Sequence, residues 1–192
     1  MIILNFDDNY IQPWAEASPW MRKQGIKATF YVCYPDKYSL AEFRALRILE
    51  EAGHEIGYHG LTHSRAALAG YPVDRNNPRL DGERQWKTLT AYIKGEIQEG
   101  MEILAKEGIK PRHFAYPFGS RSLFTDKALL PIFDSLRIGG GGIFPAGRQI
   151  PQIWGARNFD NPSADALLPK SQGKILALLM HPPTAARLAA LA

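Results

Sequence analysis

Acidic and histidine side chains stand at the ends of several short apolar segments of this sequence. Five of them come at or just after such a segment: Asp7, Asp8, His59, His63 and His181. Carboxylates and imidazoles bind divalent metals and transfer protons near neutral pH. If the apolar segments are parallel strands, their carboxyl ends meet on one face, and these side chains lie there together. The pattern therefore predicts one active site built from strand ends.

The spacing of His59 and His63 is typical of a metal site. On a helical turn, positions i and i+4 share a face, so both imidazoles reach one ion. Asp8 adds an oxygen ligand from another strand end. Two histidines and one carboxylate form a usual catalytic set for a divalent metal, zinc first, with cobalt, manganese and nickel as alternatives. The competing interpretation, two exposed histidines of a surface helix, is disfavoured by the buried-looking segment Glu55–Gly57 just before them.

Asp7 and His181 are the candidate proton-transfer groups. Adjacent residues at a strand end point to opposite sides, so Asp8 can bind the metal while Asp7 acts as a base. Two neighbouring carboxylates resist being ionised together unless a cation is close, and a metal ion supplies that cation. His181 is the candidate acid that protonates a leaving group. The alternatives are turn or helix-capping roles for the two aspartates and a buried core position for His181.

The segments that must position these side chains alternate between strand and helix patterns. Strands are expected at Ile2–Phe6, Ala28–Val32, Glu55–Tyr58, His113–Tyr116, Ser135–Ile138 and Ile175–Met180. Helices are expected at Trp14–Gln24, Leu40–Ala52, Glu83–Glu107, Thr125–Phe133 and Thr184–Ala192. Gly70–Gly82 is expected to be a surface loop, and Gly139–Gly142 a flexible one, because its glycines do not match a phosphate-binding spacing. We expect an α/β fold with a mainly parallel sheet, in a single domain spanning residues 1–192.

Composition excludes several classes of protein. The formal charge is only +4, and the basic residues are scattered, so no nucleic-acid partner is expected. No segment is long enough to span a membrane, and no signal peptide precedes the first strand, which makes a cytoplasmic location the default expectation. Cys33 is the single cysteine, so a disulfide within the chain is excluded. We expect Cys33 to be a small core residue.

Five segments resemble, in order, conserved segments of the polysaccharide deacetylases, the NodB-like carbohydrate esterases of family four. Asn5–Asn9 is similar to the family's T-F-D-D-G motif, and Ala28–Val32 to its second strand. Gly53–His63 closely resembles the family's metal motif. Phe114–Gly119 is similar to the F-A-Y-P-Y-G variant of the third motif, and Leu179–His181 to the last motif. The resemblance covers nearly the whole chain.

This resemblance implies a distorted (β/α) barrel of about seven parallel strands and metal-dependent removal of N-acetyl or O-acetyl groups from sugars. The implied partner is an acetylated sugar or glycan. The resemblance also implies residue roles: Asp7 as general base, His181 as general acid, Asp8, His59 and His63 as metal ligands, and the backbone N–H of Phe118 as an oxyanion donor. His54, which lies within the metal motif, is implied to be structural.

Three departures from the family pattern have consequences for the site. Asn9 replaces a glycine that borders the site, so we expect a different fit to the substrate. Ala115 replaces an arginine that orients the base in many members, and Arg157 is placed where the same variant class often carries an arginine. We expect Arg157 to substitute for it. The Asp-Trp signature of the fourth motif is absent, and Trp154 either stacks on a sugar ring or belongs to the core.

Two other functions stay open at this point. The fold also serves hydrolysis of purine rings and cyclic imides, so an amidase acting on a small cyclic or ureide amide is the first alternative. A catalytically inactive carbohydrate-binding protein is the second. The complete set of acidic and histidine residues argues against the second, because a binding module has no need to keep it. Fold alone establishes none of these functions.

Overall fold

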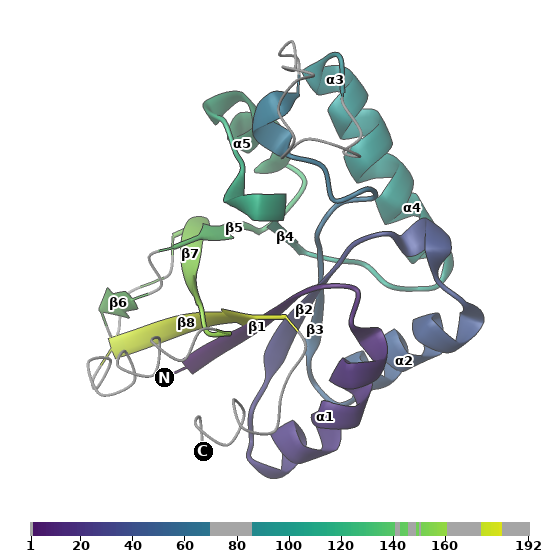
Figure 1. Cartoon of the computed structure of the whole chain (residues 1–192), viewed down its shortest axis with the longest axis vertical. Helices are drawn as coiled ribbons and strands as arrows, with labels where there is room; N and C mark the ends of the chain where they lie inside the picture. Colours follow the sequence, from purple (N-terminus) through teal and green to yellow (C-terminus); the bar gives the residue numbers. More distant parts are fainter. Residues whose placement is uncertain are drawn as a thin grey trace.

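A closed barrel of parallel strands forms the centre of the molecule (Figure 1). The computed structural model describes residues 2–69, 86–140, 143–145, 149, 151–160 and 174–181. The barrel strands are β1 (Ile2–Asp8), β2 (Ala28–Val32), β3 (Glu55–Tyr58), β4 (His113–Ala115), β5 (Ser135–Gly139), β7 (Ile153–Asn158) and β8 (Lys174–Met180). Each pairs in parallel with the next, and β8 pairs with β1 to close the ring. The expected α/β barrel of about seven parallel strands is confirmed.

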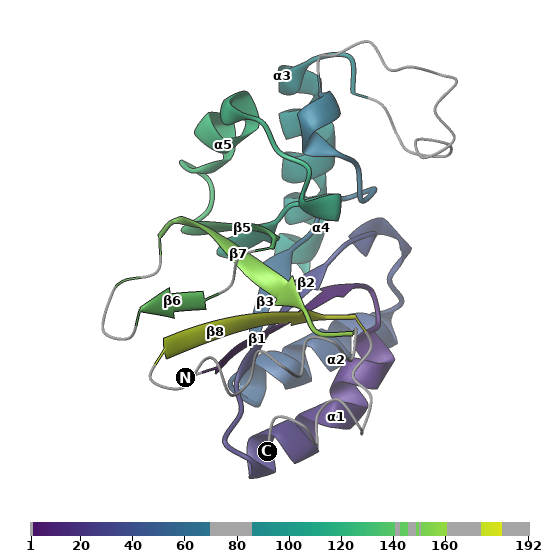
Figure 2. The ribbon, with the colours of Figure 1, turned by 60° about the vertical axis from the view of Figure 1, so that its left-hand side comes forward.

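Helices cover the outside of this ring. The helical segments are α1 (Ile11–Lys23), η1 (Pro35–Lys37), α2 (Leu40–Glu51), η2 (Ala66–Leu68), α3 (Leu89–Tyr92), η4 (Ile93–Gln98), α4 (Glu99–Lys106), η5 (Pro117–Gly119) and α5 (Leu123–Leu129). In Figure 1, α1 and α2 lie side by side, and α3 and α4 follow one another along another flank. Figure 2 shows β7 and β8 in front, with the short antiparallel strand β6 (Ile143–Pro145) beside β8. Among the described helices, none has the length and apolar character needed to cross a bilayer.

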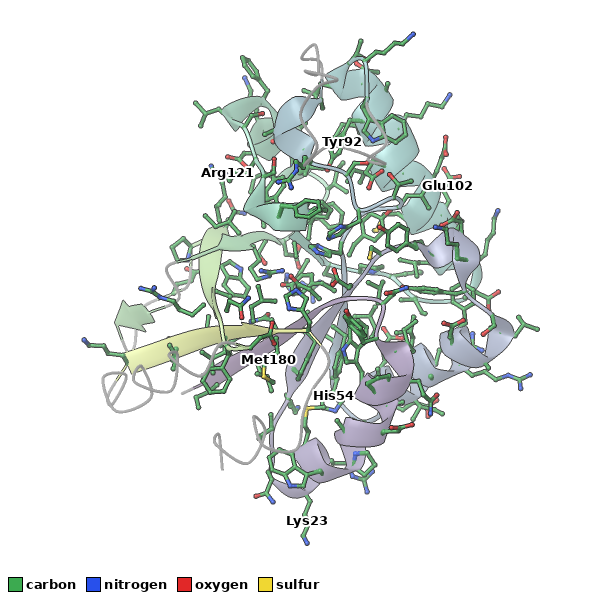
Figure 3. The ribbon with its side chains drawn as sticks, in the orientation of Figure 1. Lys23, His54, Tyr92, Glu102, Arg121 and Met180 are labelled. Carbon is green, nitrogen blue, oxygen red and sulfur yellow. The ribbon has the colours of Figure 1, made fainter. Side chains whose placement is uncertain are left out.

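Alternation along the strands separates an apolar outer layer from a more polar interior. Leu4 and Phe6 of β1 belong to the main apolar cluster, which also holds Trp14 of α1 and Leu46 of α2. Successive side chains of a strand point to opposite faces, so Asp7 lies inside the barrel. A smaller apolar cluster fills part of that interior, with the following members: Ile3, Trp154, Ala156, Ala177 and Leu179. In Figure 3, Lys23 and Glu102 point outward from α1 and α4.

Three residues that were considered in the sequence, His54, Cys33 and Trp154, are buried in the structure. The ring of His54 is buried and accepts a hydrogen bond at Nδ1 from the backbone N–H of Ala28 (3.2 Å), while its Nε2 contacts Ser18 Oγ at 3.0 Å. This confirms the structural role expected of His54. Cys33 is fully buried, and burial raises the pKa of its thiol. Trp154 is buried and its Nε1–H donates to Ser135 Oγ (3.2 Å), which favours the core interpretation.

Most of the expected elements are present, with shifted ends. The strands Ala28–Val32 and Glu55–Tyr58 have the predicted bounds. The helix predicted at Thr125–Phe133 instead begins at Leu123, because Ser122 forms a capping box with Thr125. Strands β6 and β7 were not predicted. The expected loop at 70–82 and the expected helix at 184–192 lie outside the described residues, as do residues 141–142 of the glycine run.

The single long helix predicted at Glu83–Glu107 is wrong in two respects. The helical run starts later, because the Thr88 side chain accepts a hydrogen bond from Ala91 N and caps α3. Its middle, η4, is π-helical, with a wider backbone turn than an α-helix. Residues 83–85 lie outside the described residues. The π-helical turn carries Glu96, a fully buried acidic residue that packs against the proposed site.

Candidate metal and active site

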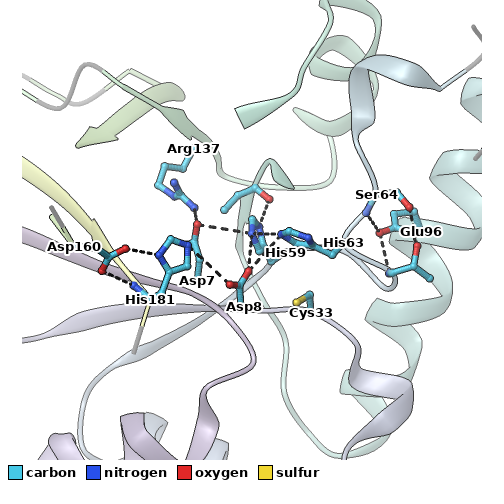
Figure 4. Close-up of polar contacts among 12 residues, drawn as sticks. Asp7, Asp8, Cys33, His59, His63, Ser64, Glu96, Arg137, Asp160 and His181 are labelled. Atoms are coloured by element: carbon cyan, nitrogen blue, oxygen red, sulfur yellow. Dashed lines mark hydrogen bonds and ion pairs between the residues drawn. The ribbon is translucent and has the colours of Figure 1, made fainter. Parts of the chain in front are cut away.

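The side chains predicted to do chemistry converge on one pocket at the carboxyl ends of the strands. The pocket has a volume of about 350 Å³. Its walls include the predicted site residues Asp7, Asp8, His59, His63, Phe118 and His181. Figure 4 shows these aspartates and histidines facing one another from segments far apart in the sequence. The expectation that polar strand ends meet on one face of the barrel is therefore confirmed.

Asp8, His59 and His63 form a compact group of potential metal ligands. One ligand atom from each lies within 4.8 Å of the others. His63 Nε2 is 3.3 Å from Asp8 Oδ1 and 3.2 Å from His59 Nε2, and His59 Nε2 is 3.7 Å from Asp8 Oδ1. Ligand atoms that each lie about 2.0–2.1 Å from one ion are separated by about 3–4 Å. The geometry thus fits one divalent cation.

The protonation state of the two histidines also fits a metal site. Burial, with a smaller contribution from Arg137, lowers the pKa of His59 to about 3. Burial and the neighbouring His59 lower the pKa of His63 to about 4. Both rings are therefore neutral at pH 7, the form that binds metals. His59 Nδ1–H donates to the carbonyl oxygen of Ala115 (2.7 Å), which leaves the Nε2 lone pair for an ion.

The backbone that brings the histidines together is a loop and not the helical turn assumed from the spacing. His59 follows β3 directly, and Gly60 then takes a φ of +94°. His63 itself has a φ of +56°, a left-handed conformation that non-glycine residues adopt rarely. The predicted pairing of His59 and His63 holds, but its stated cause is wrong. A reversal of the chain aims the two Nε2 atoms at one another.

Left-handed backbone is concentrated at this site. Among the described residues, the non-glycine residues with positive φ are Asp8, Tyr34, His63 and Phe118. Three of them line the pocket, and the backbone N–H of Tyr34 donates to Leu61 O in the loop that carries His63 (3.1 Å). Each such residue carries a conformational cost of about 1–3 kcal/mol, which persists only where the surroundings impose it. The rest of the fold therefore holds these residues in place.

Asp7, the predicted base, is paired with Arg137 inside the barrel. The two side chains are almost completely buried, with exposures of 6% for Asp7 and 2% for Arg137, and Arg137 Nη2 donates to Asp7 Oδ2 (Figure 4). Burial raises the pKa of Asp7, and the guanidinium of Arg137 opposes that rise. The second oxygen, Oδ1, is buried without a hydrogen-bond partner among the described residues. A water molecule or substrate group in the pocket can use it.

Arg157 does not take the position expected of it. It shares its side of β7 with Ile153, which packs against the outer apolar cluster, whereas Ala156 and Asn158 line the pocket. Alternation therefore points Arg157 away from the barrel interior, and its side chain is exposed. The prediction that Arg157 orients Asp7 is wrong, because β7 was not recognised as a strand.

Arg137 lies directly beside Ala115, the alanine at the position where the resemblance implies an arginine. Ala115 of β4 and Arg137 of β5 are register partners on adjacent parallel strands. Residues paired in this way point to the same face, so both face the interior. A guanidinium from β5 therefore enters the space that the small Ala115 leaves on β4. Strand alternation was the available signal, because Leu136 lies in the outer cluster and its neighbour Arg137 must point inward.

His181, the predicted acid, is held by an aspartate that the sequence analysis missed. His181 Nδ1 contacts Asp160 Oδ2, and the backbone N–H of His181 donates to Asp160 Oδ1 at 3.2 Å. The hydrogen bond to Asp160 raises the pKa of His181 above its ordinary value. His181 Nε2 faces the pocket, 3.9 Å from Asp8 Oδ2. Asp160 follows β7, so its position was hidden together with that strand.

Phe118 forms part of the pocket rim. It has a left-handed φ of +57°, and its side chain is 53% exposed. Its ring centroid lies 4.6 Å from that of His63, and the Arg65 guanidinium lies 3.8 Å from the centre of the same ring. The position at the pocket wall is compatible with an oxyanion-binding N–H at Phe118, which stays a prediction.

Comparison with known proteins identifies similar sequences and folds. Residues 1–131 match the family model described as polysaccharide deacetylase. No curated protein matches the sequence. A family 4 carbohydrate esterase from Streptomyces lividans, solved with acetate, has a TM-score of 0.63 at 18% identity, over 99% of this chain and 83% of that one.

Two further solved structures have the same fold. The catalytic domain of a peptidoglycan N-acetylglucosamine deacetylase from Eubacterium rectale has a TM-score of 0.58 at 12% identity, over 99% of this chain and 80% of that one. A family 4 carbohydrate esterase pseudoenzyme from Bacillus anthracis has a TM-score of 0.60 at 18% identity, over 98% of this chain and 57% of that one. At these identities the likeness concerns the fold alone.

Proposed function

Because this chain belongs to the polysaccharide deacetylase family, we propose that it is a metal-dependent hydrolase that removes acetyl groups, N-acetyl first, from a sugar or glycan. Family membership supports deacetylation of carbohydrates. The observation that carries the finer proposal is the meeting of a three-residue ligand group, a buried carboxylate and a carboxylate-held histidine in one pocket.

The residues of the pocket divide the reaction between them. Asp8, His59 and His63 would hold a divalent cation, zinc first, which supplies Lewis-acid polarisation of the acetyl carbonyl. Asp7 accepts a proton from the attacking water at its unpartnered Oδ1. His181 donates its Nε2 proton to the departing amine.

Neighbouring charges act on both proton-transfer groups. Burial raises the pKa of Asp7, and the charge of Arg137 opposes that rise and so favours the ionised form, which accepts a proton. The hydrogen bond from His181 to Asp160 favours protonated His181, the form that donates one. The backbone N–H of Phe118 supports the negative charge that develops on the carbonyl oxygen.

The size and lining of the pocket support a small acyl group as the part of the substrate that enters. A volume of about 350 Å³ is near the lower end for small-molecule sites. Ala156 and Leu179 add small apolar surface to the wall of the pocket, which suits a methyl group. The E. rectale structure is named as an N-acetylglucosamine deacetylase, and the S. lividans structure contains acetate. Both agree with an N-acetylated sugar as substrate.

Acetate release tests the proposal. We expect the zinc-loaded protein to release acetate from chitooligosaccharides or acetylated xylan, and a chelator to stop the reaction until zinc is returned. Asp7→Asn keeps the shape of the side chain but removes the base, so turnover should fall by about 10²- to 10⁴-fold. Asp134→Asn, at an exposed residue that pairs with Arg112, is the matched control and should leave turnover unchanged.

Each alternative outcome has a clear meaning. Acetate release that persists with a chelator contradicts metal dependence. Hydrolysis of a small cyclic amide without acetate release from any glycan supports the amidase alternative. A protein that binds metal and glycan but hydrolyses nothing is an inactive member, as the B. anthracis pseudoenzyme is described to be.

A further inference from the structure

The loop that carries His63 is held from outside the pocket by one buried residue. This loop, Gly60–Ser64, has no helix or strand of its own, and two of its residues have left-handed backbone. Glu96 of η4 is fully buried and lies against it (Figure 4). A buried carboxylate is stable only where hydrogen bonds or charges satisfy it, so its partners indicate its role.

The partners of the Glu96 carboxylate lie on both sides of His63. Oε1 accepts hydrogen bonds from the backbone N–H of Thr62 (2.9 Å) and of Ser64 (3.1 Å). Oε2 accepts one from Thr62 Oγ1 (2.7 Å). The same carboxylate thus fixes Thr62 and Ser64, the residues on either side of His63. His63 has little freedom to leave its strained conformation while both contacts are present.

The backbone of Glu96 adds a second attachment, close to the other histidine. The Glu96 carbonyl oxygen accepts hydrogen bonds from Leu61 N (3.1 Å) and from the Tyr58 hydroxyl (2.6 Å). Tyr58 directly precedes His59. Glu96 therefore contacts the chain on either side of each histidine, through its carboxylate for His63 and through its carbonyl oxygen for His59.

Local sequence and helix geometry permit this close approach. A Cβ atom at Gly60 would lie 2.5 Å from Glu96 Oε1, and one at Gly100 would lie 1.8 Å from the Tyr58 hydroxyl oxygen. Glycine at both positions removes these clashes. Glu96 lies in the π-helical turn η4, and such turns occur frequently at functional sites, where they displace one part of a helix.

We propose that Glu96 is a positioning residue for the metal site: its carboxylate holds His63, and its carbonyl oxygen holds the chain around His59, in the geometry that binds the ion. The proposal rests on the proposed metal dependence. Residues that orient metal ligands typically change metal affinity by about 10- to 100-fold when removed. A residue that only completes the core would change the stability of the metal-free protein and leave affinity in the folded fraction unchanged.

The test measures Co²⁺ binding to the metal-free chain of 192 residues. The visible absorption of the bound ion reports the binding, in competition with a chelating dye. We expect Glu96→Ala to bind Co²⁺ roughly 10- to 100-fold more weakly than wild type. Glu96→Gln keeps an oxygen for both backbone N–H groups and should recover most of that loss. Glu102→Ala, at an exposed position of α4, is the control and should bind as wild type does.

A second variant keeps the proposal testable if Glu96→Ala does not fold. Thr62→Val removes only the hydroxyl that donates to Oε2 and should weaken Co²⁺ binding by about fivefold, the effect of one hydrogen bond. Amide hydrogen exchange gives an independent readout, because Glu96→Gln should speed exchange at Thr62 and Ser64, where neutral acceptors replace charged ones.

The possible results separate this inference from the proposed function. Folded Glu96→Ala and Thr62→Val proteins that both bind Co²⁺ within twofold of wild type would overturn the positioning role. Equal weakening by Glu96→Gln and Glu96→Ala would also overturn it. Wild type that binds Co²⁺ but releases no acetate refutes the proposed function alone, and wild type that binds no Co²⁺ refutes both.

Discussion

Replacing Arg137 with alanine removes the guanidinium that pairs with Asp7 inside the barrel. Both residues are at least 96% buried, so water cannot take over the role of the lost charge. An adjacent cation lowers the pKa of a carboxyl by about 1–3. Without it, the burial that already raises the pKa of Asp7 loses its strongest opposing charge. Asp7 then stays protonated to a higher pH.

The size of the effect on rate follows from that change in pKa. Only ionised Asp7 accepts a proton, and below its pKa the ionised fraction falls tenfold for each unit of pH. The acidic limb of the kcat/KM profile should therefore move to higher pH by about 1–3 in Arg137→Ala. Turnover at a pH on that limb should fall by about 10- to 1,000-fold, with partial recovery in alkaline buffer.

A transplant variant gives this prediction a positive control. Ala115→Arg combined with Arg137→Ala returns the guanidinium to the adjacent strand, about 4.8 Å away, on the same interior face. We expect the double variant to regain part of the lost activity and to move the acidic limb back. An unchanged acidic limb in folded Arg137→Ala, measured as acetate release against pH, would refute the pairing argument.

Three further predictions concern neighbouring positions. Asp160→Asn weakens the hydrogen bond, and removes the charge, that raise the pKa of His181. The alkaline limb of kcat/KM, where His181 loses its proton, should therefore move to lower pH, and a limb that stays in place would count against His181 as the acid. Arg157→Ala should leave kcat/KM within about twofold of wild type, since exposed substitutions away from a site have little effect. His54→Ala loses the contacts to Ala28 N and Ser18 Oγ and should lower the free energy of unfolding by about 1–3 kcal/mol, measured in urea, while folded protein keeps its turnover.

Sequence alone predicts the side chains whose position depends on strand ends. The apolar runs before Asp8, His59 and His181 identify strands, and parallel strands bring their carboxyl ends together without further information. Whereas the barrel was implied by the resemblance to a known family, the same logic predicted one active site built from strand ends. It also placed His63 correctly for an incorrect reason, because a spacing of four residues fits both a helical turn and a tight loop.

The residues that sequence analysis missed all depend on contacts between distant segments. Arg137 interrupts the apolar strand β5, and its partner Asp7 is in β1, far away in the sequence. Asp160 follows β7, whose run contains Gly155 and ends in polar residues, so it lacks a clear strand pattern. Glu96 lies in a helical pattern where acidic residues are usually exposed. Strand alternation can indicate that Arg137 points inward, but the partners of these three residues are decided by register and packing, which depend on the whole fold.

The register pair of Ala115 and Arg137 shows that a complete site in a barrel of this kind can draw the same functional group from either of two adjacent strands. In a closed ring of parallel strands, every interior position has a neighbour on each side, and either neighbour can deliver a long side chain to the same point. During evolution, the strand that supplies a functional group can therefore change to a neighbouring strand, while the strand order and the outer layer stay the same. A search by linear motifs counts such a site as broken. A search by register pairs, which compares each interior position with its lateral neighbours, would recognise it as complete.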